Sequence, residues 1–267
     1  MWVTRTMRNR GGLRGRIAVV TGVGRLQGIG AAVCRALAAD GADIFFTYWT
    51  PYDRAMPWSA APDEPAMLEE ELARLGVRCA RMELDLSRPE APETLLDAVE
   101  QQLGPPSILV KNACDSDLDG WDRLDAAGLD VHYAVNVRAT VLLSVAFARR
   151  FRGGSGGRII NLTSGQSRGP MPKEIAYATT KGAIDAFTVA FAAAVASRGI
   201  TVNAVNPGPT DTGWMTEQVK AELLPRFPMG RVGQPEDAAR LIRFLASDEV
   251  EWITGQILHS DGGFRYA

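Results

Sequence analysis

Tyr177 and Lys181 lie four residues apart in a stretch that predicts a helix over residues 173–197. A spacing of four places both side chains on one face of a helix. A phenol has an ordinary pKa of about 10, and a nearby ammonium group favours the charged phenolate. The pair could therefore act as a general acid and base near neutral pH. Taken alone, an ordinary neighbour pair on an exposed helix is the better interpretation of these two residues.

Two further polar residues precede the pair. Ser164 lies thirteen residues before Tyr177, after a predicted strand over residues 158–163, and Asn136 lies in a predicted helix over residues 129–151. Each has a simple structural explanation, since a serine can end a strand and an asparagine can satisfy helix backbone. The spacing of all four residues together favours a catalytic group.

A glycine-rich turn lies between a predicted strand over residues 16–21 and a predicted helix over residues 29–39. Glycines let the backbone turn sharply and approach a pyrophosphate, and the helix that follows offers free N–H groups. Between a strand and a helix, such a turn predicts a dinucleotide site. The residues assigned to it are Gly22, Gly24, Arg25, Gly28, Ile29 and Gly30.

The end of the second predicted strand, residues 43–48, bears on the choice of dinucleotide. NAD-binding enzymes usually place a carboxylate there for the ribose hydroxyls, but this strand ends in Tyr48 followed by Trp49. Arg25, inside the glycine turn, could instead meet a 2′-phosphate. Both observations favour NADPH over NADH. The alternative is that Arg25 is a solvated loop charge.

Strands alternate with helices along the whole chain. Strands are expected over residues 16–21, 43–48, 78–84, 108–111, 158–163, 201–206 and 256–259, and helices over residues 29–39, 66–75, 89–103, 129–151, 173–197 and 235–246. The alternation predicts an α/β Rossmann fold, with a doubly wound parallel sheet of about seven strands and helices on both faces. One domain is expected over residues 16–267. Residues 1–15 are expected to form a flexible extension and residues 49–65 an irregular insertion.

Composition excludes several classes of protein. The net charge of −2 gives no electrostatic case for binding nucleic acid or an anionic membrane. No uninterrupted apolar run reaches the length of a membrane-spanning helix. Three cysteines without metal-ligand spacing predict reduced thiols, and two distant histidines are too few for a zinc site. We therefore expect a cytoplasmic protein without a metal.

The order of these motifs resembles the short-chain dehydrogenase/reductase family, in particular its 3-oxoacyl-carrier-protein-reductase-like members. The resemblance runs from about residue 16 to residue 263. Besides the glycine turn and the set Asn136, Ser164, Tyr177 and Lys181, it includes Asp85, Asn112-Ala113, Asn206-Pro207-Gly208, residues 230–237 and residues 261–263.

The resemblance implies a role for each residue of the set. Tyr177 would donate a proton to a carbonyl oxygen, and Ser164 would hydrogen-bond that oxygen. Lys181 would hold the nicotinamide ribose and lower the pKa of Tyr177, and Asn136 would hold a water that links Lys181 to solvent. The expected dinucleotide contacts also include Tyr177 and Lys181, together with Tyr48, Asp85, Leu86, Asn112, Ala113, Pro207, Gly208, Thr210 and Thr212.

The implied activity is the interconversion of a ketone and a secondary alcohol, with reduction of a 3-oxoacyl or other carbonyl by NADPH as the favoured direction. Residues 210–228 are expected to form a substrate lid. The expected substrate contacts are Gln166, Met171, Trp214, Met215 and Phe227. The family also implies a homotetramer or homodimer through the helices at residues 129–151 and 173–197.

Two departures keep alternatives open. Five residues separate Gly22 from Gly28 where the family usually has three, and enoyl reductases share such a stretched turn. That branch, however, places six residues between its tyrosine and lysine, whereas this chain has three, so carbonyl chemistry is favoured. Lys111 and Cys114 stand where the family usually has an asparagine and a glycine. A lysine there should reach solvent or a carboxylate. A dinucleotide-binding regulator or scaffold without turnover is the remaining alternative.

Overall fold

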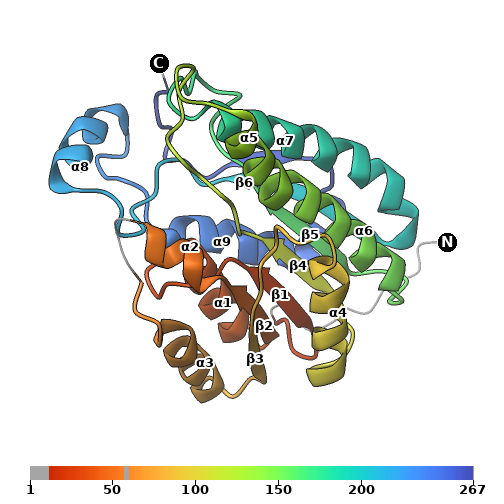
Figure 1. Ribbon diagram of the computed structural model, residues 1–267. Coiled ribbons are helices and arrows are strands. Elements are labelled where there is room, and N and C mark those ends of the chain that lie inside the picture. The colour runs from red at the N-terminus through yellow and green to blue at the C-terminus, as the bar shows by residue number, and fades with distance from the viewer. Residues whose placement is uncertain (1–11, 57–59, 267) are drawn as a thin grey trace.

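One parallel sheet holds all seven strands of the computed structural model, which describes residues 12–56 and 60–266 (Figure 1). The strand order is β3-β2-β1-β4-β5-β6-β7, so the winding reverses between β1 and β4. The strands are β1 Ile17–Thr21, β2 Asp43–Tyr48, β3 Cys79–Glu83, β4 Ile108–Lys111, β5 Gly157–Leu162, β6 Ile200–Asn206 and β7 Ile257–His259. The predicted single-domain Rossmann fold with a doubly wound sheet is confirmed.

Helices cover both faces of the sheet, as Figure 1 shows. The α-helices are α1 Ile29–Ala39, α2 Thr50–Ala55, α3 Glu64–Arg74, α4 Ala91–Gln102, α5 Ala126–His132, α6 Thr140–Arg150, α7 Ile175–Val195, α8 Glu217–Leu223 and α9 Pro235–Ala246. A π-helical segment, Tyr133–Ala139, joins α5 to α6. Helices α1 and α9 contribute to the core on one face, and α4, α6 and α7 contribute to it on the other.

The central strands are apolar because both of their faces are buried. In β1, Ala18 and Val20 belong to the core cluster that includes α1 and α9, while Ile17 and Val19 belong to the cluster that includes α4 and α6. Neighbouring side chains of a strand point to opposite faces, so a run of apolar residues fills both layers at once. This is why a short continuous apolar run predicts the first strand, residues 16–21.

Two expected loops contain helices. Residues 49–65 include α2 and the start of α3, and residues 210–228 include α8. Prolines suggested irregular structure, yet Pro51 and Pro65 lie in the first turns of α2 and α3, where a helix loses no hydrogen bond to proline. Residues 57–59 of the expected insertion lie outside the described residues.

The N-terminal extension is described only from residue 12, and residues 1–11 of this prediction lie outside the described residues. Leu13 is 2% exposed and joins the core beside α1. Its N–H donates to the carbonyl oxygen of Asp40, at 2.6 Å. This part of the predicted extension therefore packs on the domain.

Length and composition alone would let one helical stretch among the described residues, Ala126–Arg150, cross a membrane. This stretch is not an uninterrupted apolar run, so it was not identified from the sequence. Of its most apolar window, 56% is buried inside the domain. Core side chains such as Leu143 and Phe147 account for much of this apolar character.

Candidate functional site

The carboxyl ends of β1 and β4 meet where the winding of the sheet reverses, which is the usual ligand position in such folds. The side chain of Asn112 donates to the carbonyl oxygens of Thr21, at 3.0 Å, and Gly22, at 2.8 Å. Thr21 Oγ1 accepts from the N–H groups of Asn112 and Ala113, both at 3.2 Å. The structure therefore joins two predicted parts of the dinucleotide site, the glycine turn and Asn112-Ala113.

Gly22 shows why the turn needs glycine. Its φ is 73°, a left-handed conformation that other residues rarely adopt. A Cβ atom at this position would lie 2.5 Å from Cα of Ala113. The close approach of the two loops is therefore possible only with glycine here.

The turn between Gly22 and Gly28, two residues longer than is usual in the family, is held in a defined position. The N–H of Leu26 donates to Glu64 Oε2 at the start of α3, at 2.6 Å. The carbonyl oxygen of Leu26 accepts from Arg35 Nη1 of α1, at 2.8 Å. The N–H of Gly28 returns to the carbonyl oxygen of Arg25, at 3.1 Å. The longer turn is thus anchored to α1 and α3.

The first turn of α1 fits a phosphate group. Its N-cap, Gly28, has no side-chain capping hydrogen bond, and the first turn contains no acidic residue. Free N–H groups and the positive end of the helix dipole attract an anion at such a position. The residues present therefore fit the pyrophosphate of a dinucleotide, with Gly28, Ile29 and Gly30 at the helix start.

The predicted catalytic side chains come together beyond the end of β5. The Ser164 hydroxyl lies close enough to the phenol of Tyr177 to lower its pKa. The Lys181 ammonium lies 5.2 Å from the centroid of the Tyr177 ring and donates to the carbonyl oxygen of Leu162, at 2.9 Å. Burial raises the pKa of Tyr177, the nearby Cys114 raises it further, and the Ser164 hydrogen bond opposes both. The phenol is therefore protonated at neutral pH, as a proton donor must be.

Lys181 is itself buried, with 4% of the residue exposed. Burial lowers the pKa of its ammonium group, while Cys114 and Asp185 act in the opposite direction. The resemblance implied that Lys181 lowers the pKa of Tyr177. In this arrangement burial dominates the pKa values of both groups, and the ammonium group donates to Leu162.

Asn136 connects the loop after β4 to the catalytic helix. Its Oδ1 accepts from the N–H of Asp115, at 2.7 Å, and its Nδ2 donates to the Asp115 carbonyl oxygen, at 2.9 Å, and to Thr180 Oγ1, at 3.0 Å. Thr180 immediately precedes Lys181. Asn136 lies in the π-helical segment, a distortion often found at functional sites. The Asn136 side chain, which was expected to hold a water, therefore links the backbone of Asp115 to Thr180 beside Lys181.

The remaining predicted dinucleotide contacts make local hydrogen bonds. Tyr48 Oη accepts from Arg81, at 3.0 Å, and Asp85 Oδ1 accepts from the N–H of Ser87, at 2.9 Å, with Leu86 half-buried between them. Thr210 Oγ1 donates to the carbonyl oxygen of Gly208, at 3.1 Å, beyond the end of β6. Pro207 begins this loop.

Residues 210–228, the predicted lid, contact the glycine turn directly. Arg25 Nη1 donates to the carbonyl oxygen of Thr212, at 2.6 Å. Trp214 Nε1 donates to the carbonyl oxygen of Thr210, at 2.8 Å. Met215 is buried, and Phe227 packs on Phe264 with ring centroids 4.7 Å apart. The start of the segment therefore lies against the glycine turn.

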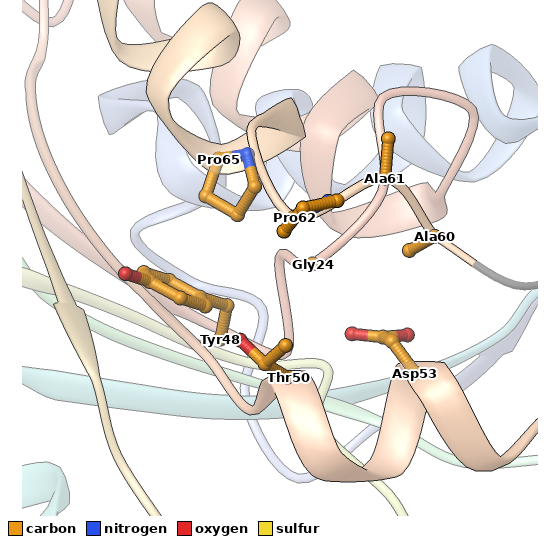
Figure 2. Close-up of a pocket in the computed structure, with 8 residues that line it drawn as sticks. All are labelled: Gly24, Tyr48, Thr50, Asp53, Ala60, Ala61, Pro62 and Pro65. Atoms are coloured by element: carbon orange, nitrogen blue, oxygen red, sulfur yellow. The ribbon is translucent and has the colours of Figure 1, made fainter.

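The other two predicted substrate contacts lie after Ser164. Gln166 Nε2 donates to Asp185 Oδ2, at 2.6 Å, and its buried Oε1 finds no partner among the described residues. Met171 is half-buried before α7. The pocket in Figure 2 lies elsewhere, beside Tyr48 and the glycine turn, and none of the predicted substrate contacts lines it.

The environment of Lys111 contradicts the expectation from the sequence. The side chain reaches neither solvent nor a carboxylate: it is 5% exposed, and its Nζ donates to Ser144 Oγ and to the carbonyl oxygen of Thr140. The Phe187 ring centroid lies 5.3 Å away. Burial lowers the pKa of the amine well below its ordinary value. The long side chain allows this, since its amine reaches a polar group between α6 and α7.

Asp119 is a residue that sequence reasoning missed. Its carboxylate accepts from the N–H groups of Ile175 and Ala176, both at 2.7 Å, at the start of α7. Burial tends to raise the pKa of this carboxyl group, but the backbone donors outweigh it and hold the pKa below its ordinary value. Asp119 therefore caps the catalytic helix just before Tyr177, from a loop 56 residues earlier. No local pattern could have revealed this contact.

A glycine turn at the reversal of a parallel sheet, together with Ser164, Tyr177 and Lys181 beyond the end of β5, is typical of a Rossmann-type oxidoreductase. The chain belongs to the short-chain dehydrogenase/reductase family: a family model described as "Enoyl-(Acyl carrier protein) reductase" matches residues 22–265. Within residues 12–56 and 60–266, no group of three or more His, Cys, Asp or Glu side chains is placed to hold a metal ion.

Curated relatives cover nearly the whole chain. The "Uncharacterized oxidoreductase YjdA" of Bacillus subtilis is 53% identical, over 93% of this chain and 96% of that protein. The "NADPH-dependent aldehyde reductase-like protein, chloroplastic" of Arabidopsis thaliana is 35% identical over 94% and 95% of the two chains. The "3-oxoacyl-[acyl-carrier-protein] reductase FabG" of Pseudomonas aeruginosa is 34% identical over 94% and 98%.

Solved structures share the fold at similar identity. A blue fluorescent protein from a metagenomic library, in complex with NADPH, has a TM-score of 0.85 and 33% identity, over 95% of this chain and 99% of that chain. A short-chain dehydrogenase from Burkholderia cenocepacia, in complex with NADP, has a TM-score of 0.83 and 35% identity, over 94% and 98%.

Proposed function

We propose that this protein reduces a ketone to a secondary alcohol with NADPH. The observation that carries the proposal is the gathering of Ser164, Tyr177 and the Lys181 ammonium beyond the end of β5. The hydroxyl groups of Ser164 and Tyr177 lie side by side, so both can donate to the same substrate oxygen. A protein that only sensed the dinucleotide would need no such group.

The preference for NADPH rests on charge. Arg25 lies in the glycine turn, and β2 ends in Tyr48 without a carboxylate. A guanidinium group suits the 2′-phosphate of NADPH because it offers several donors in a fixed geometry. One relative is named as NADPH-dependent, and two similar structures hold NADPH or NADP.

The side chains can complete a reduction as follows. When bound, the reduced nicotinamide supplies a hydride to the carbonyl carbon. Ser164 donates a hydrogen bond to the carbonyl oxygen, and Tyr177 Oη transfers its proton to that oxygen, which becomes the alcohol. Tyr177 is left as a phenolate, and the Lys181 ammonium stabilises its negative charge.

A panel of substrates tests this assignment. NADPH and NADH consumption would be followed with a 3-oxoacyl thioester, a vicinal diketone, an aromatic ketone and an enoyl thioester. Ketone reduction that prefers NADPH is the expected result. Turnover of the enoyl thioester alone would replace carbonyl reduction by double-bond reduction. Tight dinucleotide binding without any turnover would favour a regulator.

The proposal extends to assembly and location. Apolar side chains are exposed on the helices that the family resemblance assigned to subunit contacts: Leu129 and Val131 of α5, Leu142 of α6 and Val189 of α7. Exposed apolar surface on one set of helices is typical of an interface. We propose a cytoplasmic homotetramer or homodimer. Light scattering would reveal a monomer if this is wrong.

Asp119→Ala is expected to lower kcat about tenfold and leave KM for the dinucleotide within about twofold, because α7 would lose its cap beside Tyr177. Asp119→Asn keeps one acceptor oxygen and should restore part of the rate. Asp122→Ala, on the exposed part of the same loop, is the control. Equal rates in all four proteins, measured by steady-state kinetics, would show that Asp119 does not position Tyr177.

A further inference from the structure

A carboxylate that no local sequence pattern predicted reaches the glycine turn from α2. A small pocket lies between the glycine turn and the segment after β2, and in Figure 2 Asp53 points from α2 toward Gly24. The pocket is lined by Gly24, Tyr48, Thr50, Asp53, Ala60, Ala61, Pro62 and Pro65. Gly24 and Tyr48 are residues assigned to the dinucleotide, so the pocket belongs to its adenosine end.

Asp53 packs directly on the glycine turn. A Cβ atom on Gly24 would lie 1.8 Å from Asp53 Oδ2, so no other residue could replace this glycine without moving the carboxylate. Asp53 Oδ1 lies 3.7 Å from Arg25 Nε, and the two side chains are only 15% and 18% exposed. Burial raises the pKa of Asp53, and the Arg25 guanidinium beside it opposes this shift by favouring the charged carboxylate.

Arg25 is held by several groups at once. Besides Asp53, it donates to the carbonyl oxygen and to Oγ1 of Thr212, at 2.6 and 3.3 Å. Burial lowers the pKa of Arg25, and the negative charges of Asp53 and then Glu64 oppose this shift. A 2′-phosphate that binds Arg25 would have to approach this carboxylate. Two negative groups beside one guanidinium repel each other.

We propose that Asp53 is an internal competitor for Arg25 and sets how strongly the protein prefers a dinucleotide that carries a 2′-phosphate. The inference rests on the proposed function, in which Arg25 binds that phosphate. A phosphate can bind fully only after the carboxylate has moved away, and this reduces the affinity for NADPH. A dinucleotide without the 2′-phosphate does not meet the same repulsion. Asp53 therefore reduces the difference in affinity between NADPH and NADH.

The helix that carries Asp53 contributes no buried residue to the core. None of the six residues of α2 is buried, so little packing opposes a shift of the helix. The competitor can therefore leave Arg25 without disturbing the core.

Binding of two small probes tests the inference without turnover. Adenosine 2′,5′-bisphosphate and 5′-AMP differ only in the 2′-phosphate, and calorimetry gives a dissociation constant for each. Asp53→Asn is expected to tighten binding of the bisphosphate about 5- to 10-fold and to leave 5′-AMP within about twofold. Asp63→Asn, which removes the same charge from an exposed position, should change neither.

A double-mutant cycle with Arg25→Ala separates the inference from the proposed function. In the Arg25→Ala background, the effect of Asp53→Asn on the bisphosphate should disappear. Unchanged bisphosphate binding in Asp53→Asn, or weakened 5′-AMP binding, would overturn the inference, the latter because Asp53 would then hold the ribose. If Arg25→Ala itself leaves bisphosphate binding unchanged, the NADPH preference fails as well. Thermal melts confirm that each variant is folded.

Discussion

Tyr177→Phe is expected to lower kcat about 10³-fold while the dinucleotide still binds. The ring remains, so packing around α7 is conserved, and only the hydroxyl that carries the proton is lost. The remaining donor, Ser164, can hydrogen-bond the substrate oxygen but has no ammonium group beside it comparable to Lys181. Initial rates with the best substrate of the panel, together with dinucleotide titrations by fluorescence, measure both quantities.

Ser164→Ala provides the comparison for this variant. Loss of the Ser164 hydroxyl removes one donor but leaves the proton source, so its effect on kcat should be smaller than that of Tyr177→Phe. A Tyr177→Phe protein that keeps more than about a tenth of the wild-type kcat would show that another group or water supplies the proton. A variant that no longer binds dinucleotide would indicate a structural change instead.

Lys111→Met is expected to raise the free energy of unfolding by about 1–3 kcal/mol, an unusual gain for a core substitution. Burial without a carboxylate partner opposes the charged amine, and methionine has a similar length without the charge. The carbonyl oxygen of Thr140 keeps a donor in the variant, because Ser144 Oγ also donates to it, at 2.7 Å. Denaturant unfolding of both proteins measures the difference.

The same substitution should change how stability depends on pH. Because the pKa of Lys111 is lowered in the folded protein, the unfolded chain binds more protons between that lowered value and about 10.4. The free energy of unfolding of the wild type therefore contains a contribution that rises with pH over this range, and Lys111→Met removes it. Lys173→Met, at an exposed position, is the control. A less stable Lys111→Met protein would mean that the hydrogen bond to Ser144 outweighs the cost of burial.

The features that the sequence predicted best are those with a local periodic signal. The boundaries of α1, β2, β4 and α9 agree with the expected ranges, since the apolar pattern and the flanking glycines act within a few residues. The glycine turn and the residues of the catalytic helix were identifiable for the same reason. Spacing along the chain was sufficient to place them.

The features that were missed depend on contacts between distant segments. The capping of α7 by Asp119 joins residues 56 positions apart. The polar surroundings of Lys111 come from α6, and those of the longer glycine turn come from α3. The NADPH preference was predicted from the end of β2 and from Arg25, whereas the carboxylate that lies beside Arg25 comes from α2. A single sequence contains no record of such tertiary neighbours.

The hydrogen bond between Arg25 and Thr212 has a consequence for the apparent affinity of the protein for dinucleotides. It joins the glycine turn to residues 210–228, so a dinucleotide that binds along the turn would have to fit beside this contact or break it. If the contact has to break, the apparent affinity falls by the fraction of molecules in which it is broken, for phosphorylated and unphosphorylated dinucleotides alike. The acceptor is a main-chain oxygen, so no side chain at position 212 can abolish it. Changes at Arg25 therefore alter access to the groove as well as recognition within it.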